Sequence, residues 1–226
     1  MNVKLIAATT PLIEGVHNID ELLAYAARVS NPSNQLNSGT AAKLLGYCIR
    51  HGHWSVFETA SFTVEIETSL AIAMQILRHR SFTFQMFSQR YAEVDKLGGL
   101  FMGPILRMRA EGGNRQGSGE EAPEALQLTQ ANIREQLAYN YNALIASGVA
   151  PESARFYLPQ CTKTRLYMTG NIRSWIHYLA QRLDGHTQKE HREVADKIRD
   201  IFADLCPTTY NACVTTEIPA HRVLPA

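Results

Sequence analysis

Hydrophobic and polar residues alternate in some segments of this chain and recur at helical spacing in others. Residues 62–67 alternate, with Phe62, Val64 and Ile66 apolar, which is typical of a half-buried β-strand. Further strands are predicted at residues 3–8 and 162–168. Helical spacing predicts helices over these segments: 20–29, 39–51, 70–79, 123–147, a short one opened by Pro151 that carries Arg155, one that begins after Gly170 and Asn171, and 188–205.

Several predicted helices carry a recognisable apolar stripe. The helix at 20–29 presents Leu22, Leu23, Ala26 and Val29. The stripe of the helix at 123–147, which Gly148 ends, consists of Leu126, Ile133, Leu137, Tyr141, Leu144 and Ile145. In the helix at 188–205 the inward residues are Val194, Ile198, Ile201, Phe202 and Leu205. The helix at 188–205 is interpreted as core or oligomer contact.

The helix predicted at 70–79 leads into the most polar part of the pattern. Thr68 and Ser69 are candidate caps for its first turn. Arg78 and His79 follow Gln75 by three and four residues, so a helix would bring them to one side. Candidate chemistry therefore begins at the end of this helix.

The order of these elements favours an α+β fold. Strands and helices follow one another without a regular strand-helix-strand cadence, and no glycine fingerprint of a dinucleotide-binding fold is present. With 226 residues, 45% of them hydrophobic, the chain can bury one substantial core, so we expect a single domain over 1–226. Residues 110–121 contain four glycines and match no phosphate-binding loop, which predicts a mobile surface insertion.

Composition narrows the functional classes. The net charge is only +1, so any anion site must be a local cluster of arginines, and a general nucleic-acid binder is disfavoured. No window approaches 18 apolar residues, and we expect a soluble cytoplasmic protein that does not contact membranes. Cys48, Cys161, Cys206 and Cys213 form no CxxC pair and are interpreted as reduced thiols.

The segment Arg78–Tyr91, RHRSFTFQMFSQRY, is the strongest candidate for a binding site. It lies in a stretch without a carboxylate from Glu67 to Glu93, so no acid nearby in sequence neutralises its arginines. Guanidinium groups bind phosphates bidentately, and serine and glutamine side chains can complete such a site. Four aromatic residues interleave with the polar ones, which favours an ordered pocket wall: Phe82, Phe84, Phe87 and Tyr91.

A second candidate surface is the polar side of the helix that follows Asn171. Its core side holds Ile172, Trp175, Ile176, Leu179 and Leu183. The opposite side carries Arg173, Ser174, His177, Tyr178 and Gln181, which are ligand-binding residue types where a solvated helix would carry Glu and Lys. This composition indicates a ligand.

Two other classes of protein remain open on the residues alone. The basic segment could bind nucleic acid, and the histidines could serve a metal hydrolase. Neither His51 with His53 nor His186 with His191 has the spacing of a zinc motif, so no metal site is predicted. Ser88 lacks a recognisable His-carboxylate pair, which makes a phosphate ligand the better interpretation than a nucleophile.

The segment resembles the signature of the flavin-dependent thymidylate synthases, an Arg-His-Arg followed after seven residues by Ser and then by Arg-Tyr. Arg78, His79, Arg80, Ser88 and the pair Arg90-Tyr91 match. Gln85 stands where the family often has Asn, and Met86 stands where it usually has Glu. The resemblance extends over most of the chain, through HGHWSVFE, ARFYLP and NIRSWIHYLAQRLDGH.

The resemblance implies two sets of binding residues. The set for FAD is Ser30, His53, Ser55, Glu58, Arg78, His79, Arg80, Asn171, Arg173, His177 and His186. The set for dUMP is Gln75, Arg78, Met86, Phe87, Ser88, Gln89, Arg90, Arg155 and Arg182. Arg182 is the implied catalytic residue, because a guanidinium at the N3/O4 edge of uracil would stabilise the charge that makes C5 nucleophilic.

The implied activity is the reductive methylation of dUMP to dTMP. Methylenetetrahydrofolate would supply the carbon and FAD, reduced by NADPH, the hydride. The resemblance also implies an antiparallel sheet flanked by helices, and a homotetramer with active sites shared between subunits. Nucleic acid and membranes are not expected partners.

Overall fold

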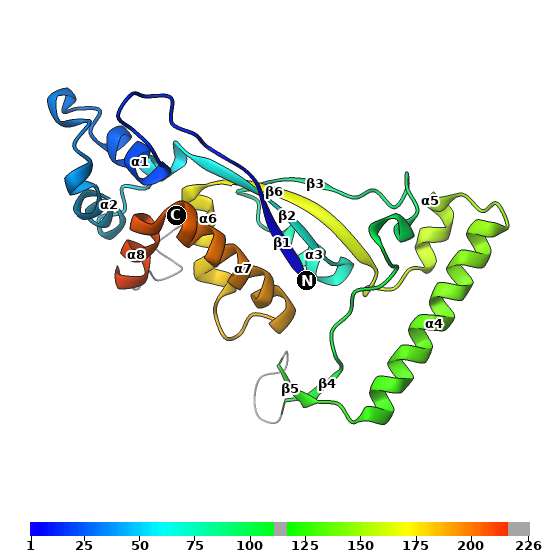
Figure 1. Cartoon of the computed structure of the whole chain (residues 1–226). Helices are drawn as coiled ribbons and strands as arrows, with labels where there is room; N and C mark the ends of the chain where they lie inside the picture. Colours follow the sequence, from blue (N-terminus) through cyan, green and yellow to red (C-terminus); the bar gives the residue numbers. More distant parts are fainter. Residues whose placement is uncertain (111–116, 217–226) are drawn as a thin grey trace. The chain divides into compact units, whose positions relative to one another are not determined.

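A computed structural model describes residues 1–110 and 117–216 (Figure 1). The chain divides into two compact units. The first unit contains residues 1–2, 67–78 and 85–166, and the second contains 3–66, 79–84 and the chain from Tyr167 onward.

A four-stranded sheet contributes residues to both units. Its strands are β1 (Asn2–Ala8), β2 (Ser61–Ser69), β6 (Lys163–Asn171) and β3 (Thr83–Met86), in the order β1-β2-β6-β3. The side chain of Thr63 meets that of Thr169 at 2.8 Å, and Glu67 meets Arg165 at 2.5 Å. Residue numbers fall along β6 as they rise along β2, so the two strands run antiparallel. The predicted α+β class with an antiparallel sheet is confirmed.

The second unit packs its helices around aromatic side chains. Its helices are α1 (Ile19–Ala27), α2 (Ala41–Arg50), α6 (Ile172–Arg182), α7 (Lys189–Leu205), α8 (Pro207–Thr216) and the 3-10 turns η1 (Pro32–Asn34), η2 (Ser38–Thr40) and η3 (Trp54–Glu58). Trp175 of α6 stacks on Phe62 of β2 with 4.4 Å between ring centroids, and its Nε1 donates to the carbonyl of Gly170 at 3.0 Å. This contact fixes α6 on the strand that precedes it.

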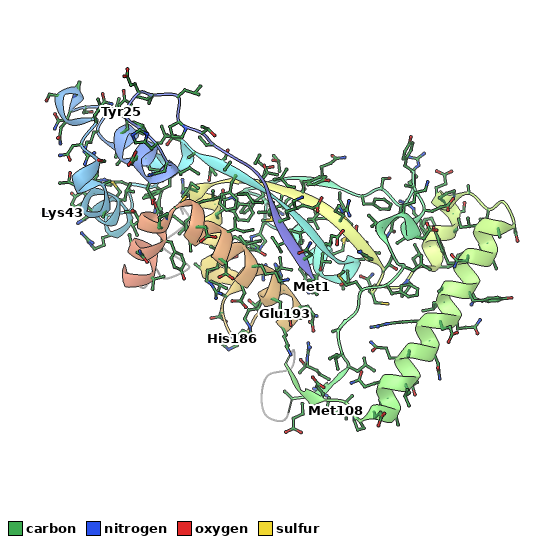
Figure 2. The ribbon with its side chains drawn as sticks, viewed as in Figure 1. Met1, Tyr25, Lys43, Met108, His186 and Glu193 are labelled. Carbon is green, nitrogen blue, oxygen red and sulfur yellow. The ribbon has the colours of Figure 1, made fainter. Side chains whose placement is uncertain are left out.

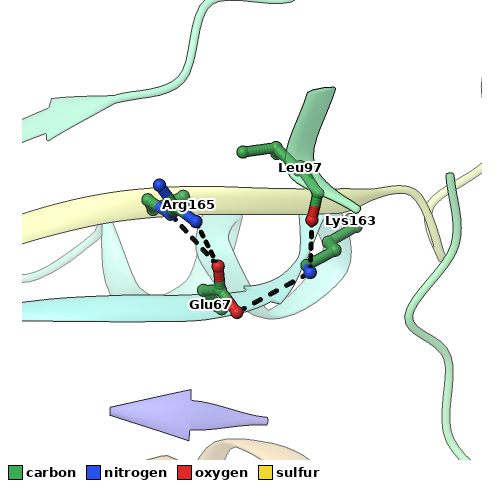
Figure 3. A network of polar contacts seen from close by, with 4 residues as sticks. All are labelled: Glu67, Leu97, Lys163 and Arg165. Atoms are coloured by element: carbon green, nitrogen blue, oxygen red, sulfur yellow. Dashed lines mark hydrogen bonds and ion pairs between the residues drawn. The ribbon is translucent and has the colours of Figure 1, made fainter. Parts of the chain in front are cut away.

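The first unit contains the remaining elements. They are α3 (Leu70–Ile76), η4 (Val94–Leu97), β4 (Arg107–Arg109), β5 (Ser118–Glu121), α4 (Glu124–Ala146), α5 (Pro151–Ala154) and η5 (Arg155–Tyr157). A polar network joins the sheet to η4 (Figure 3). Glu67 binds Arg165 and also lies 3.6 Å from Lys163, whose Nζ donates to the carbonyl of Leu97 at 2.6 Å. The Arg165 side chain, by its hydrogen bond, holds the pKa of Glu67 below its ordinary value.

Most predicted elements are confirmed with shifted ends, but three details are wrong. The helix predicted at 70–79 ends at Ile76, with Leu77 as its C-cap, so Arg78 and His79 do not share a helical face with Gln75. Ser69 occupies the N-cap position without a side-chain capping bond. Val29 lies beyond α1 and is 70% exposed instead of packing inward, because Arg28 already caps that helix.

Two further predictions concern the first unit, namely the apolar stripe of α4 and the glycine-rich insertion at 110–121. Of the stripe predicted for α4 only Tyr141 is buried, whereas Leu126 and Ile133 are about half exposed. The glycine-rich insertion lies in part outside the described residues, at 111–116, while its flanks pair as the antiparallel strands β4 and β5. Within the described chain no helix is long and apolar enough to cross a membrane.

Candidate active site

The Arg-His-Arg segment is held on the second unit by a close approach of one ring to a glycine. Phe82 is 7% exposed, and a Cβ placed on Gly170 of β6 would lie 2.4 Å from its ring, which no other residue could accept. Ser174 of α6 donates its hydroxyl to the carbonyl of Ser81 at 3.1 Å. The segment around His79 is therefore fastened to both β6 and α6.

His79 and Arg182 form the central contact of the second unit. The Nε–H of Arg182 donates to Nε2 of His79 at 2.8 Å, so the imidazole must be neutral, with its proton on Nδ1. Burial, with the charge of Arg182 next in importance, lowers the pKa of His79 to about 4. The predicted catalytic arginine is thus oriented by a histidine that stays uncharged at neutral pH.

A second contact joins η3 to α6. Arg173 donates to the carboxylate of Glu58, so two residues of the predicted FAD set pair with one another. His177, one turn further along α6, is 8% exposed, and its Nδ1 is buried without a hydrogen-bond partner in the described structure. Burial, and then the charges of Arg173 and Arg182, lower the pKa of His177. A buried nitrogen without a partner fits a polar ligand such as the flavin dinucleotide.

The other predicted FAD residues lie in more open places. Asn171 accepts a hydrogen bond from the backbone N–H of Ser174 at 2.9 Å, so its side-chain oxygen serves as the cap of α6. His186 lies in the turn between α6 and α7, where its ring contacts Asp184 at 2.8 Å (Figure 2). His53 is exposed, with its ring 5.6 Å from that of Tyr47. Ser30, Ser55 and Arg80 are exposed as well.

The predicted dUMP residues, except Arg182, belong to the first unit. Arg90 pairs with Glu152 at 2.8 Å, and both side chains are more than half exposed. Gln89 beside it has a buried Nε2 without a partner among the described residues. Ser88 is exposed, while Arg155 is half-buried and lies 5.6 Å from the centre of the Phe156 ring. An exposed ion pair is worth about 0–1 kcal/mol, so a phosphate could displace Glu152 from Arg90.

The rest of this set is placed by α3 and β3. Gln75 is half-buried in α3, and Arg78 is exposed just after it. Met86 ends β3 and is half-buried, and the N–H of Phe87 donates to the carbonyl of Arg165 at 2.8 Å. The backbone at residues 86 and 87 is therefore fixed by the sheet, whatever side chain stands at position 86.

Three residues that contact the site, Glu152, Tyr178 and His191, are absent from the predicted binding sets, although Tyr178 belongs to the polar helix side that indicated a ligand. Glu152, the partner of Arg90, follows Pro151 on a turn where an acid is ordinary. Tyr178 and His191 are completely buried beside His79, with ring centroids 4.8 and 6.3 Å from it. The sequence relates His191 only to His186, as a pair without zinc-motif spacing. Among the described residues no group of three acids, histidines or cysteines could hold a metal ion.

Neither the thiols nor an apolar cavity of the second unit belongs to the predicted binding sets. Burial raises the pKa of Cys48, Cys206 and Cys213, the last to about 12, so these groups are thiols at neutral pH. A cavity of about 490 Å³ opens between α6, α7 and α8, with apolar walls such as Leu179 and Phe202. No residue of the predicted FAD or dUMP sets lines it.

Comparisons with known proteins identify relatives of this chain. The family model described as "Thymidylate synthase complementing protein" matches residues 11–208. A probable flavin-dependent thymidylate synthase of Paramecium bursaria Chlorella virus 1 is 48% identical over 94% of this chain and 98% of its own. The flavin-dependent thymidylate synthase of Synechocystis sp. is 45% identical over 92% and 97% of the two chains.

This chain is also similar to a solved structure. The UMP/dUMP methylase PolB from Streptomyces cacaoi, bound with 5-Br dUMP, superposes with a TM-score of 0.79 and 28% identity, and the match covers 95% of this chain and 94% of PolB. The same enzyme bound with 5-Br UMP gives a TM-score of 0.80. On the family model and on these relatives, the chain belongs to the flavin-dependent thymidylate synthase family.

Proposed function

We propose that this chain converts dUMP to dTMP by reductive methylation. Methylenetetrahydrofolate is the carbon donor, and NADPH reduces the FAD that supplies the hydride. The observation that carries the proposal is the 2.8 Å bond from Arg182 to a neutral, buried His79. It holds one nitrogen of the guanidinium fork and leaves the terminal nitrogens for a planar, polar ring edge. Uracil offers such an edge at N3 and O4.

The residues of the second unit fit a flavin. FAD supplies the redox chemistry, while the protein binds and orients it. His177 offers a buried ring nitrogen that lacks a partner in the part of the chain that the structure describes, and Arg173, paired with the exposed Glu58, offers a cation. We assign the whole predicted FAD set to this cofactor, with Asn171 acting chiefly through its cap on α6.

The residues of the first unit fit a nucleotide monophosphate. Among the described residues Arg90 pairs only with the exposed Glu152, and the buried amide nitrogen of Gln89 has no partner there. Arg155 lies close in sequence to Glu152. Guanidinium and amide groups of this kind bind phosphate oxygens well. Glu67 is the last acid before the Arg78–Tyr91 segment, and it is already bound to Arg165 and Lys163. Substrate phosphate is therefore the ligand we assign to Ser88, Arg90 and Arg155.

Absorbance spectra and product analysis test this function together. Purified protein should show flavin absorbance that bleaches on anaerobic addition of NADPH. With methylenetetrahydrofolate, dUMP should yield dTMP, and UMP run in parallel shows whether the ribose 2′-hydroxyl is accepted. Protein that binds no flavin, or that binds flavin and forms no dTMP, would contradict the proposal.

We also propose a homotetramer with active sites shared between subunits, located in the cytoplasm. The support for assembly is α4, a helix of 23 residues of which only Tyr141 is buried. Its exposed apolar side chains include Leu126 (45%), Leu128 (59%) and Ile133 (55%). The four cysteines are free, which suits a reducing compartment.

Light scattering after size-exclusion chromatography should give about four times the 25.3 kDa chain mass, and Ile133→Glu should lower the measured mass.

Met86→Glu is expected to raise kcat/KM for dUMP about threefold to tenfold. A carboxylate would orient the neighbouring arginines, whereas the thioether of Met86 offers only apolar, flexible contact. Steady-state rates of dTMP formation measure the effect. Met74→Glu, on an exposed site of α3, is the matched control and should change nothing. An unchanged or lower value in Met86→Glu would mean that only the backbone at position 86 matters.

A further inference from the structure

Two buried side chains of the second unit, Tyr178 and His191, have no place in the predicted binding sets. Tyr178 is on α6 and His191 is on α7, and both are 0% exposed. A tyrosine hydroxyl and an imidazole cost free energy to bury unless they are hydrogen-bonded. The Tyr178 hydroxyl lies 3.1 Å from Nε2 of His191, so each satisfies the other. Apolar side chains could have filled this space without that requirement.

The pair lies directly against His79. The rings of His79 and Tyr178 are 4.8 Å apart at an interplanar angle of 66°, and the rings of His79 and His191 are 6.3 Å apart and perpendicular. The far edge of His79 accepts the Nε–H of Arg182 at 2.8 Å. A continuous chain of contacts therefore leads from His191 through Tyr178 and His79 to Arg182.

His79 needs this support, because its bond to Arg182 demands one tautomer and one ring orientation. Nε2 can accept only while the ring proton is on Nδ1, and a flip of the ring would put the Cε1–H in place of the accepting nitrogen. Burial keeps both histidines neutral, with the pKa of His79 near 4 and that of His191 near 3. The orientation of the His79 ring must also be fixed. The rings of Tyr178 and His191, which pack against it, restrict its rotation.

We propose that Tyr178 and His191 form a positioning unit that holds the His79 ring in the orientation that accepts the Arg182 Nε–H. Neither residue touches a substrate or cofactor in this role. Its effect on turnover depends on the proposed function, whereas its effect on the His79 ring does not. The fixed ring in turn sets the direction of the Arg182 guanidinium.

The test is NMR of the flavin-loaded, full-length protein labelled with ¹⁵N at histidine. The His79 signals, assigned by their loss in His79→Gln, should show the Nδ1–H tautomer in the parent protein. Tyr178→Phe keeps the ring and removes the hydroxyl, and it should give a mixture of tautomers. We expect kcat for dTMP formation to fall about fivefold to tenfold, with KM for dUMP within about twofold.

A double-mutant cycle separates a unit from two independent residues. His191→Leu should resemble Tyr178→Phe, and the double variant should be no worse than either single one. His191→Gln, which can still bond the Tyr178 hydroxyl, should recover most of kcat. Tyr141→Phe alters another buried tyrosine, in the first unit, and should leave both the His79 signals and kcat unchanged.

Several outcomes would overturn the proposal. One is that Tyr178→Phe keeps the His79 tautomer and the kcat of the parent protein. Another is that Tyr178→Phe loses kcat while the His79 tautomer stays fixed, which would mean that Tyr178 has a packing role alone. Should His191→Leu not fold, Tyr178→Phe and His191→Gln still decide the matter. A parent protein that forms no dTMP would refute the proposed function, but the His79 signals would still test the positioning unit.

Discussion

Arg182→Ala should lower kcat for dTMP formation by about 100-fold or more while the protein stays folded and keeps its flavin. A donor aimed at charge that develops in the transition state is commonly worth about 10²–10³ in rate. Arg182 is such a donor, because His79 fixes its Nε and leaves its terminal nitrogens to meet the substrate. The predicted FAD set does not include Arg182, so visible absorbance should change little.

Two further variants make this result specific. Arg182→Lys keeps the positive charge but loses the planar fork and the Nε–H that His79 accepts, so most of the activity should still be lost. Arg199→Ala removes an arginine that binds Asp196 and Asp200 on α7, and it should turn over like the parent. Parent-like kcat in Arg182→Ala would remove Arg182 from the chemistry.

The parts of the fold that were predicted from sequence are those where side-chain periodicity decides the structure. The alternation over 62–67 is reproduced in β2, where every second side chain is buried. In α6 the apolar positions Ile172, Trp175 and Ile176 are buried as expected. Its polar side, which indicated a ligand, proved to be largely buried too, with Ser174, His177 and Tyr178 inside the unit. Composition showed that this face is unusual but not what each side chain contacts.

The parts that sequence did not predict depend on contacts between distant segments. The helix expected to reach residue 79 ends at Ile76, and the chain beyond it is held by Phe82 against Gly170, 88 positions away. Helical spacing continues through Arg78, so no local signal marks this end. His79 and Arg182 are likewise 103 residues apart. The motif identified both residues, but only the fold shows that one orients the other.

The helix α8 was missed for a related reason. Its sequence, PTTYNACVTT, is rich in β-branched residues and has no clear apolar stripe, so helix propensity and pattern are both weak. Its first turn is instead held by Asp20 of α1. One carboxylate oxygen accepts from the N–H of Thr208 at 2.7 Å, and the other accepts from the N–H and hydroxyl of Thr209. A distant acid thus supplies the cap that the local sequence lacks.

Asp20→Ala should therefore lower the free energy of unfolding by about 2–4 kcal/mol, since buried donors left without an acceptor cost about 1–3 kcal/mol each in full. Asp20 is 4% exposed and Thr209 is 0% exposed, so water cannot easily replace the carboxylate. The negative charge also lies at the N-terminal end of α8, where the helix dipole favours it. Denaturant unfolding followed by circular dichroism measures the loss.

Asp20→Asn refines this expectation, because an amide keeps one acceptor oxygen but turns a donor toward one of the two backbone N–H groups. It should fall between the parent and Asp20→Ala. Asp204→Ala is the matched control, since Asp204 is an exposed acid of α7 and surface changes are usually within about 0.5 kcal/mol. If Asp20→Ala unfolded at the same denaturant concentration as Asp204→Ala, the carboxylate would not be what holds α8. Its three hydrogen bonds would then contribute no net stability, and the packing of α8 against α2, α7 and α1 would have to hold that helix.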